Sequence, residues 1–326
     1  MPITDINSNP DDLTLTITGD YPVPVERLWQ AWADPRQLER FWGPPSWPAT
    51  FTRHDMVEGG RSEYYMTGPE GNRSAGFWVF ESVDPGKGFT IVDGFAHEDG
   101  TPNDDLPGTR SEFRFEATVT GSRYVAVTHF QDLTSMQQLV EMGMVEGARE
   151  AMGQIDEVLA DLASFAAGKG TEPQLLDDTR VRVSRIIRGT VDQVWRAHHD
   201  PELMRRWLLG PDGWTMPVCG IATEVGEGYR YEWESDDGEQ RFGFEGELLE
   251  SNPPHRAVTT ERMTGTDGPA TVNEMTLTPV EGGTLLAIVI TYPSMELRDQ
   301  ILETGMVDGM ETSYARLESM LEAAAV

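Results

Sequence analysis

The stretch LWQAWADPRQLERFWGPPSW at residues 28–47 returns later in the chain as VWRAHHDPELMRRWLLGPDGW at residues 194–214. Trp29 of the first stretch corresponds to Trp195 of the second, 166 positions further on, and both stretches share an Asp-Pro pair and a late tryptophan. A repeat of this kind in a chain of 326 residues predicts a duplicated domain.

The repeat divides the chain into a first domain at residues 1–168, a linker at 169–178 and a second domain at 179–326. Glycine and proline, which interrupt regular structure, occur in the region predicted to contain the linker. Each predicted domain of about 160 residues is long enough to bury its own hydrophobic core.

Both halves begin with the same predicted elements. A strand with period-2 alternation is expected at residues 13–19 and again at 181–189. A short helix follows, with apolar residues at i, i+3, i+4 and i+7. The Asp-Pro pair then ends this helix and begins a second one, because proline suits a first helical turn and disfavours helix in the residue before it.

The rest of each half is a run of short strands followed by one helix. Gly, Pro, Asn and Asp separate the strands, which indicates an antiparallel meander. One continuous helix is expected at residues 135–162 and another at 295–324. This order of elements predicts an α+β fold made of two tandem helix-grip domains, in each of which a curved antiparallel sheet wraps a long C-terminal helix. A hollow is expected between sheet and helix in each domain.

The shared pattern W-x-A-x-x-D-P-x-x-[LM]-x-R-[FW] resembles the SRPBCC, or START-like, superfamily. The closing segments GMVEGAREAMGQIDEVL and GMVDGMETSYARLESML are similar to the terminal helix of one branch, the homologues of the activator of the heat-shock protein 90 ATPase. The superfamily includes polyketide cyclases and aromatases, lipid carriers and enediyne self-resistance proteins. The resemblance implies a cavity protein, and a shared fold does not by itself imply a shared chemistry.

Charge and composition exclude several classes of partner. The chain has 25 basic and 55 acidic side chains, a formal net charge of −30, which opposes binding to nucleic acid or to anionic lipid. No apolar run approaches the ~20 residues of a membrane span, so no membrane insertion is expected. The opening MPITDINSNPDD lacks the features of a signal peptide, and the single cysteine suits a reducing compartment, so we expect a cytoplasmic protein. The residues identify no protein partner.

Catalytic motifs are missing from the sequence. No P-loop, G-x-S-x-G or dinucleotide fingerprint occurs in the right context, so no cofactor is expected. The six histidines show no metal-ligand spacing, so no metal site is expected. His129 and Arg110 are the candidate acid–base residues for a cyclase reaction. A histidine in such a strand is more often a structural residue.

Aromatic and sulfur-containing side chains are the candidate walls of the two cavities. The alternative for each is that it packs in a core without touching a ligand. Four glycines inside the long helices are expected to mark where helix faces sheet, either for close packing or to leave space. The candidates in the first domain are Trp32, Phe41, Trp42, Trp47, Tyr64, Met66, Gly143 and Gly147, and those in the second are His198, Trp207, Trp214, Tyr231, Trp233, Gly305 and Gly309.

One strand face stays open from sequence alone. Tyr64 and Met66 belong to the more apolar face of their strand, whereas Glu63 belongs to the other, and a slip of one residue would exchange the two faces.

The sequence leaves three functions to consider. The first is binding of a hydrophobic polyketide or linear polyene in secondary metabolism or self-resistance. The second is a polyketide cyclase or aromatase, and the third is a chaperone-ATPase-activator-like interaction module.

Overall fold

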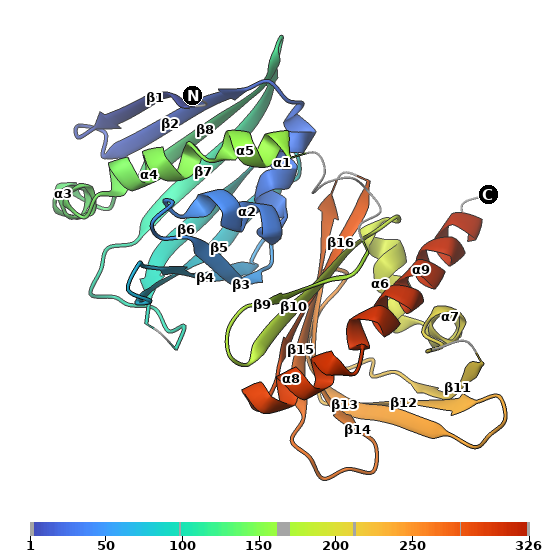
Figure 1. Cartoon of the computed structure of the whole chain (residues 1–326). Helices are drawn as coiled ribbons and strands as arrows, with labels where there is room; N and C mark the ends of the chain where they lie inside the picture. The colour runs from blue at the N-terminus through green and yellow to red at the C-terminus, as the bar shows by residue number, and fades with distance from the viewer. Residues whose placement is uncertain (1–2, 98, 162–169, 211–212, 281, 325–326) are drawn as a thin grey trace. The chain divides into compact units, whose positions relative to one another are not determined.

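The computed structural model describes residues 3–97, 99–161, 170–210, 213–280 and 282–324. The chain divides into two compact units, Met1–Phe165 and Ala166–Val326. Each unit contains one antiparallel sheet with helices against one of its faces, as Figure 1 shows. This architecture confirms the predicted α+β helix-grip fold in both halves. The predicted domain end at residue 168 lies outside the described residues.

The first sheet has eight strands in the order β1-β2-β8-β7-β6-β5-β4-β3, and all neighbouring strands are antiparallel. β2 and β8 are therefore partners at one side of the meander although more than 100 residues separate them in the chain. The strands are β1 (Ile3–Asn9), β2 (Thr14–Tyr21), β3 (Ala49–His54), β4 (Arg61–Thr67), β5 (Arg73–Asp84), β6 (Gly88–Ala96), β7 (Thr109–Thr118) and β8 (Gly121–His129).

The second sheet repeats this topology in the order β11-β12-β13-β14-β15-β16-β10-β9. Its strands are β9 (Glu172–Leu175), β10 (Arg180–Ile187), β11 (Trp214–Gly220), β12 (Gly228–Ser235), β13 (Arg241–Asn252), β14 (Arg256–Met263), β15 (Thr271–Val280) and β16 (Gly283–Thr291).

An outer strand precedes the predicted first strand in each domain. β1 pairs with β2, and β9 pairs with β10, so both sheets begin one strand earlier than the sequence pattern indicated. Residues 172–175, which the sequence analysis placed in a linker, thus belong to the second sheet. The short β9 has a proline and little apolar alternation, so its sequence does not show the period-2 signal of a strand.

Two short helices follow the first strands in each domain: α1 (Val25–Ala33) and α2 (Pro35–Trp42), and α6 (Val191–His199) and α7 (Pro201–Trp207). Asp34 accepts a hydrogen bond from the backbone N–H of Arg36 at 3.0 Å and caps α2. Asp200 caps α7 in the same way through the N–H of Glu202 at 3.0 Å. The Asp-Pro pair recurs because it caps a helix N-terminus and starts its first turn.

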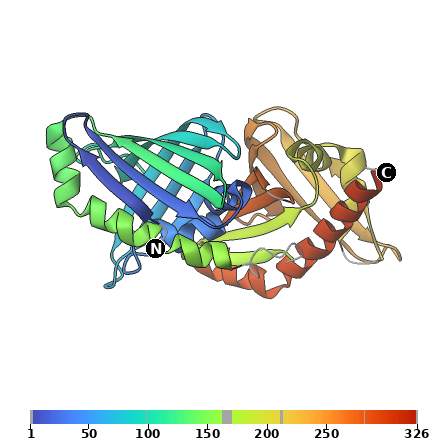
Figure 2. The ribbon, with the colours of Figure 1, turned by 90° about the horizontal axis from the view of Figure 1, so that it is seen from above.

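The long C-terminal helix of each domain is interrupted, which corrects the prediction of one continuous helix. The first domain has α3 (Leu133–Glu141), α4 (Met144–Met152) and α5 (Ile155–Ala160), and the second has α8 (Met295–Glu303) and α9 (Met306–Ala324). Figure 2 shows these helices following one another along their sheets. The first break falls at Gly143, with φ of 91°, and the matching break at Gly305, with φ of 80°. A left-handed residue cannot continue an α-helix, and glycine adopts this conformation without strain.

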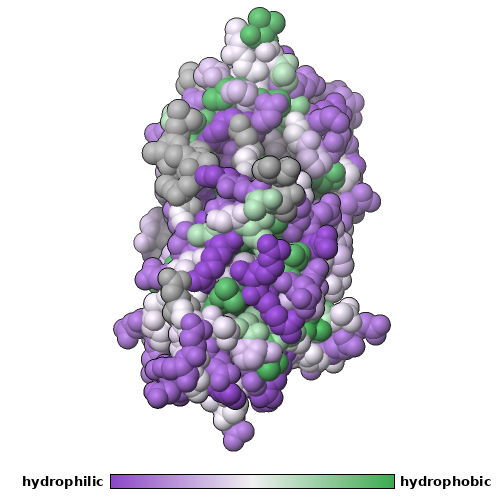
Figure 3. Space-filling view, turned by 90° about the vertical axis from the view of Figure 1, so that its right-hand side faces the viewer, coloured by the Kyte–Doolittle hydropathy of each residue, from purple (hydrophilic) through white to green (hydrophobic). Residues whose placement is uncertain are grey.

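Hydrophilic residues cover most of the molecular face shown in Figure 3, and the hydrophobic residues on it lie singly or in small groups. This distribution agrees with the net charge of −30. No helix within the described ranges is both long enough and apolar enough to cross a lipid bilayer.

We expect Gly143→Ala to lower the free energy of unfolding by about 1–2 kcal/mol, because alanine is strained at positive φ. Gly147→Ala is the matched control: this glycine lies inside α4, and an added Cβ would meet no atom within 4 Å. Alanine has a higher helix propensity than glycine, so Gly147→Ala should raise the free energy of unfolding by about 0.5–1 kcal/mol. Urea denaturation of both variants measures the difference, and equal effects would contradict this explanation of the helix break.

Candidate functional site

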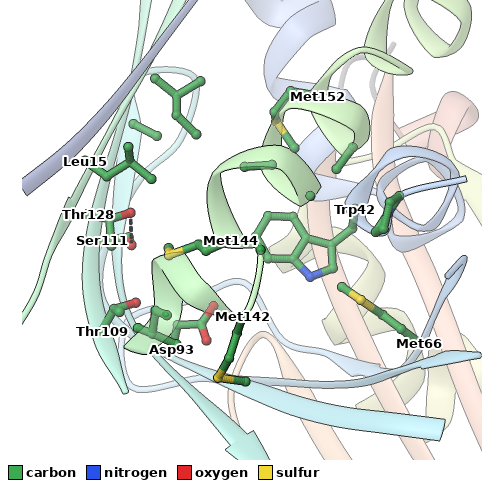
Figure 4. Close-up of a pocket in the computed structure, with 18 of the residues that line it drawn as sticks. Leu15, Trp42, Met66, Asp93, Thr109, Ser111, Thr128, Met142, Met144 and Met152 are labelled. Atoms are coloured by element: carbon green, nitrogen blue, oxygen red, sulfur yellow. Dashed lines mark hydrogen bonds between the residues drawn. The ribbon is translucent and has the colours of Figure 1, made fainter. Parts of the chain in front are cut away.

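A cavity of about 420 Å³ lies in the first domain, between the inner face of the sheet and the α3–α4 helices (Figure 4). The strands that supply its floor are β2, β4, β5, β6, β7 and β8, and α2 with the loop after it supplies one side. Met142, at the break between α3 and α4, lines the cavity and is 52% exposed, so it marks the rim.

The cavity wall is mostly apolar. Aromatic rings and methionines dominate it, and both suit contact with flat or irregular apolar molecules. The larger apolar lining residues are Leu15, Ile17, Trp42, Trp47, Tyr64, Met66, Phe95, Phe113, Tyr124, Leu139, Met142, Met144 and Met152.

Six predicted first-domain residues line this cavity, namely Trp42, Trp47, Tyr64, Met66, Gly143 and Gly147. Trp32 and Phe41 do not, and both are fully buried in the core. Their ring centroids are 5.2 Å apart, so these two residues pack the domain rather than reach a ligand.

The open question about the β4 face is answered by the geometry. Tyr64 and Met66 point to the cavity. Glu63 forms an ion pair with Arg61 at 2.9 Å, and both residues lie on the other face of the strand. Alternation of successive side chains in a strand requires this separation.

The two glycines of the cavity have different roles. Gly143 provides the left-handed break, whereas Gly147 is helical. An added Cβ would meet nothing within 4 Å at either position. These glycines therefore border open space, and the alternative of close helix–sheet packing does not apply to them.

Polar side chains on the inner face of the sheet interrupt the apolar wall. Ser111 and Thr128, paired across β7 and β8, share a hydrogen bond of 2.9 Å. Thr109 lies next to Asp93, its partner across β6 and β7. Figure 4 shows Asp93 beside Thr109 and Met142 at the same end of the cavity.

Asp93 is the one carboxylic acid among the residues that line the cavity. Burial raises the pKa of Asp93 to about 7, and the indole N–H of Trp78, its cross-strand neighbour on β5, partly opposes the rise. Among the described residues, no Lys, Arg or His forms an ion pair with Asp93. Asp93 is not among the residues predicted from the sequence, although an acid in the apolar strand FTIVDGF is a usable signal.

The second domain has an acid at the corresponding position. Six consecutive pairs of the β6–β7 ladder end at Asp93 and Thr109, and six consecutive pairs of the β14–β15 ladder end at Glu261 and Thr271. Burial raises the pKa of Glu261 as well, partly opposed by the side chains of Asn273 and Tyr229. The hydroxyl of Tyr229 donates to the carbonyl of Thr260 at 2.7 Å and lies 3.4 Å from the carboxyl of Glu261.

The candidate acid–base residues do not reach the cavity. Arg110 and His129 alternate with the lining residues Ser111 and Thr128, so they lie on the outer face of the sheet. Arg110 binds the carboxylates of Glu81 and Glu112 at 2.8 and 2.6 Å, and its side chain is 45% exposed. His129 lies 3.8 Å from Glu112. The proposed catalytic pair is therefore a surface ion-pair group.

The predicted aromatic residues of the second domain pack against one another. Trp207 stacks on Tyr314 with centroids 5.7 Å apart, and Trp233 stacks on Phe242 at 4.9 Å. Trp214 contacts the same Phe242 ring at 5.1 Å. Tyr231 and Trp214 are partly buried against this core. At Gly309 an added Cβ would meet nothing within 4 Å, and Gly305 provides the helix break.

His198 occupies a core position rather than a binding site. Its Nδ1 donates to the carbonyl of Val194 at 2.8 Å, and its ring packs 4.8 Å from that of Trp207. Burial lowers the pKa of His198 to about 4, against a smaller opposite effect of the Val194 hydrogen bond. A neutral, packed histidine is the structural alternative that the sequence analysis had weighed.

Comparison with known proteins agrees with this geometry. The family model described as Activator of Hsp90 ATPase homolog 1-like protein matches residues 22–160 and again residues 188–322. The chain belongs to this AHSA1-like family. The predicted START-like resemblance is thereby confirmed, and the fold is that of a ligand-binding or activator-like module.

Similar solved structures each match about half of the chain. A Mycobacterium smegmatis crystal structure is 46% identical, covering 49% of this chain and 98% of its own, with a TM-score of 0.46. An Arthrobacter aurescens solution structure is 40% identical, covering 48% and 92%, with a TM-score of 0.47. An AHSA1-like protein of Aeromonas hydrophila is 18% identical, covering 43% and 93%, with a TM-score of 0.38. No curated protein matches the chain.

Metal ligands do not gather in the described part of this AHSA1-like chain. Within those ranges, no three His, Cys, Asp or Glu side chains lie where they could hold one ion together. The polar chemistry of the cavity therefore rests on Asp93 and the hydroxyl groups near it.

We expect Asp93→Asn to stabilise the AHSA1-like chain at pH 8. The folded pKa of about 7 exceeds the ordinary 3.8, so the folded state keeps a proton that the unfolded state loses. The free-energy cost of having Asp93 in the folded state grows as the pH rises from about 4 to 7, and it reaches its full value above pH 7. The variant should gain up to about 4 kcal/mol at pH 8 and almost nothing near pH 4. Urea unfolding at both pH values measures this gain, and a gain that does not depend on pH would contradict it.

His198 should produce the opposite pH dependence. Its folded pKa of about 4 lies below the ordinary 6.5, so the unfolded state binds a proton first as the pH falls. Stability is therefore lost between pH 6.5 and 4, by up to about 3 kcal/mol for this group. His198→Phe should remove that part of the acid sensitivity when thermal unfolding is compared at pH 7 and pH 5. An unchanged loss in the variant would assign the sensitivity to other groups.

Proposed function

We propose that the first domain binds a hydrophobic small molecule, of polyketide or linear polyene type, in the cavity between its sheet and its α3–α4 helices. The observation that carries the proposal is the apolar space of about 420 Å³ lined by aromatic rings and methionines. Pockets of about 300–1,000 Å³ with apolar walls and few polar groups are typical of small-molecule sites.

The open space at the helices favours a ligand over an imperfectly packed core. Protein interiors are close-packed, and a void costs stability in proportion to its volume. Two glycines that border the cavity, Gly143 and Gly147, leave space that side chains would otherwise occupy. A bound apolar molecule would recover the lost contacts.

Apolar burial supplies the driving force for this binding. At about 25 cal/mol per Å², a ligand that buries about 300 Å² of apolar surface gains about 7 kcal/mol before the costs of association. Stacking on Trp42, Trp47 or Tyr64 adds about 0.5–1.5 kcal/mol per ring pair. Micromolar dissociation constants are the scale expected for such a site.

Binding is favoured over catalysis by the placement of the acid–base groups. Arg110 and His129 are on the outer face of the sheet and are engaged with Glu112. Among the described lining residues, Asp93 is the one side chain that titrates near neutral pH. A general acid and a general base with separate pKa values, as a cyclase would use, are not paired in the cavity.

Quenching of tryptophan fluorescence by retinol, a linear polyene, and by anthraquinone, a fused-ring compound, tests the proposal. We expect saturable binding of at least one of them, with no change in the compound recovered afterwards. Gly147→Phe should weaken the binding at least tenfold, because the ring fills the space beside α4. A chemically altered product would instead identify an enzyme.

Gly309→Phe is the matched control for this experiment. Gly309 corresponds to Gly147 in the second domain and also has no atom within 4 Å of an added Cβ. Its substitution should leave binding in the first domain unchanged. Equal losses in both variants would contradict the assignment of the site to the first domain. Failure of both compounds to bind the unsubstituted chain would remove the support for this ligand class.

A further inference from the structure

An acid recurs at one position of both sheets although the side chains around it differ. Asp93 faces Thr109, and Glu261 faces Thr271, at the same end of matching ladders. The register of the neighbouring strands also corresponds, which places Trp78 of the first domain at the position of Gly246 in the second. The duplicated carboxyl is thus a feature of the inner face of each sheet.

Each acid has a neutral polar side chain as its neighbour, and in the part of the chain that the structure describes neither acid forms an ion pair with a cation. Tyr229 reaches Glu261 across Gly246, whose missing side chain leaves room for the tyrosine ring. In the first domain the indole of Trp78 takes that place beside Asp93. A neutral donor stabilises a carboxylate only in part, and buried charges in proteins are normally paired with an opposite charge.

Asp93 faces a cavity large enough for a ligand. Trp42, Trp47 and Tyr64 line the same cavity, and aromatic rings attract cations. The overall charge of −30 adds a field that attracts cations and repels anions. The missing charge partner of Asp93 is therefore one that a ligand can supply.

We propose that the cavity of the first domain selects apolar molecules that carry a positively charged amine, which pairs with the carboxylate of Asp93. This inference rests on the proposed function, since it names the ligand class of the same site. The amine end lies at the Asp93–Thr109 end of the cavity. The apolar body extends along the aromatic and methionine wall.

Pairing with a cation requires Asp93 to be ionised, so binding displaces a proton below pH 7. The groups that face Asp93 are Trp78 on β5, Thr109 on β7, Tyr64 on β4 and Met142 after α3. Tyr64 is the titratable one, and its pKa is raised by burial and by the charge of Asp93, so it stays neutral. Affinity for a permanently charged cation should thus rise from pH 6 to pH 8, with about half a proton released per ligand at pH 7.

Equilibrium dialysis of the full chain with (1-naphthylmethyl)trimethylammonium and with its neutral isostere, in which carbon replaces nitrogen, tests the inference. We expect the cation to bind at least tenfold more tightly than the isostere at pH 8, and this preference to shrink severalfold at pH 6. Asp93→Asn should abolish the preference and leave binding of the isostere within about threefold, since the apolar contacts remain.

Glu261→Gln is the matched control and should keep the full preference, because it alters the corresponding acid of the other domain. Equal affinities for the two probes at pH 8, or a preference that survives Asp93→Asn, would overturn the inference and leave the proposed function standing. Absence of binding by both probes would overturn the inference, and only the further failure of retinol and anthraquinone to bind would overturn the proposed function with it. Calorimetry of the unsubstituted chain in two buffers measures the released proton independently of any variant, and no release at pH 7 would also overturn the inference.

Discussion

Successive side chains of a strand point to opposite faces of a sheet, and this constraint determines which residues of the first domain can meet a ligand. On β7 and β8 it places Ser111 and Thr128 in the cavity and sends Arg110 and His129 outward. On β4 it separates Tyr64 from Glu63. The broken C-terminal helix then covers only part of the inner face. The cavity lies where the helix has glycines instead of side chains that could fill the space.

The two domains show how one backbone supports two different interiors. The matching ladders have the same register in both domains. The large aromatic side chains of the core, however, come from different helices in the two domains. The first domain packs Trp32 of α1 at its centre, whereas the second has His198 at that point and packs Trp207 of α7 instead. At the helix, Tyr314 of α9 takes the place of Met152 and stacks on that tryptophan.

The same divergence supports the proposal that the first domain binds a ligand. Met310 stands where the first domain has Ala148, a lining residue of the cavity. Phe242 stands where it has Ser74, and its ring stacks on Trp233. Larger side chains therefore occupy three positions of the second domain that border open space in the first.

The repeated Asp-Pro phrase was sufficient to predict the duplication, the paired short helices and the helix-grip fold, because capping and periodicity are local properties of the sequence. Local signals did not show the helix break, since glycine tolerates both helical and left-handed conformations. They also missed β9, which is a strand only because β10 supplies its hydrogen bonds. Six of the eight first-domain candidates line the cavity, whereas Asp93 was missed because its importance arises from long-range contacts with other strands.

Among the described residues, the carboxyl group of Asp93 has no charged partner, and it faces an apolar space large enough for a ligand. The measurement to make is a carbon-13 NMR titration of the aspartate carboxyl signals, with the Asp93 signal identified by its loss in Asp93→Asn. We expect a pKa near 7 for the free chain. The pKa should fall by at least one unit when the naphthylmethyl ammonium cation is bound. A free-chain pKa near 4, or one that does not respond to the bound cation, would contradict this expectation.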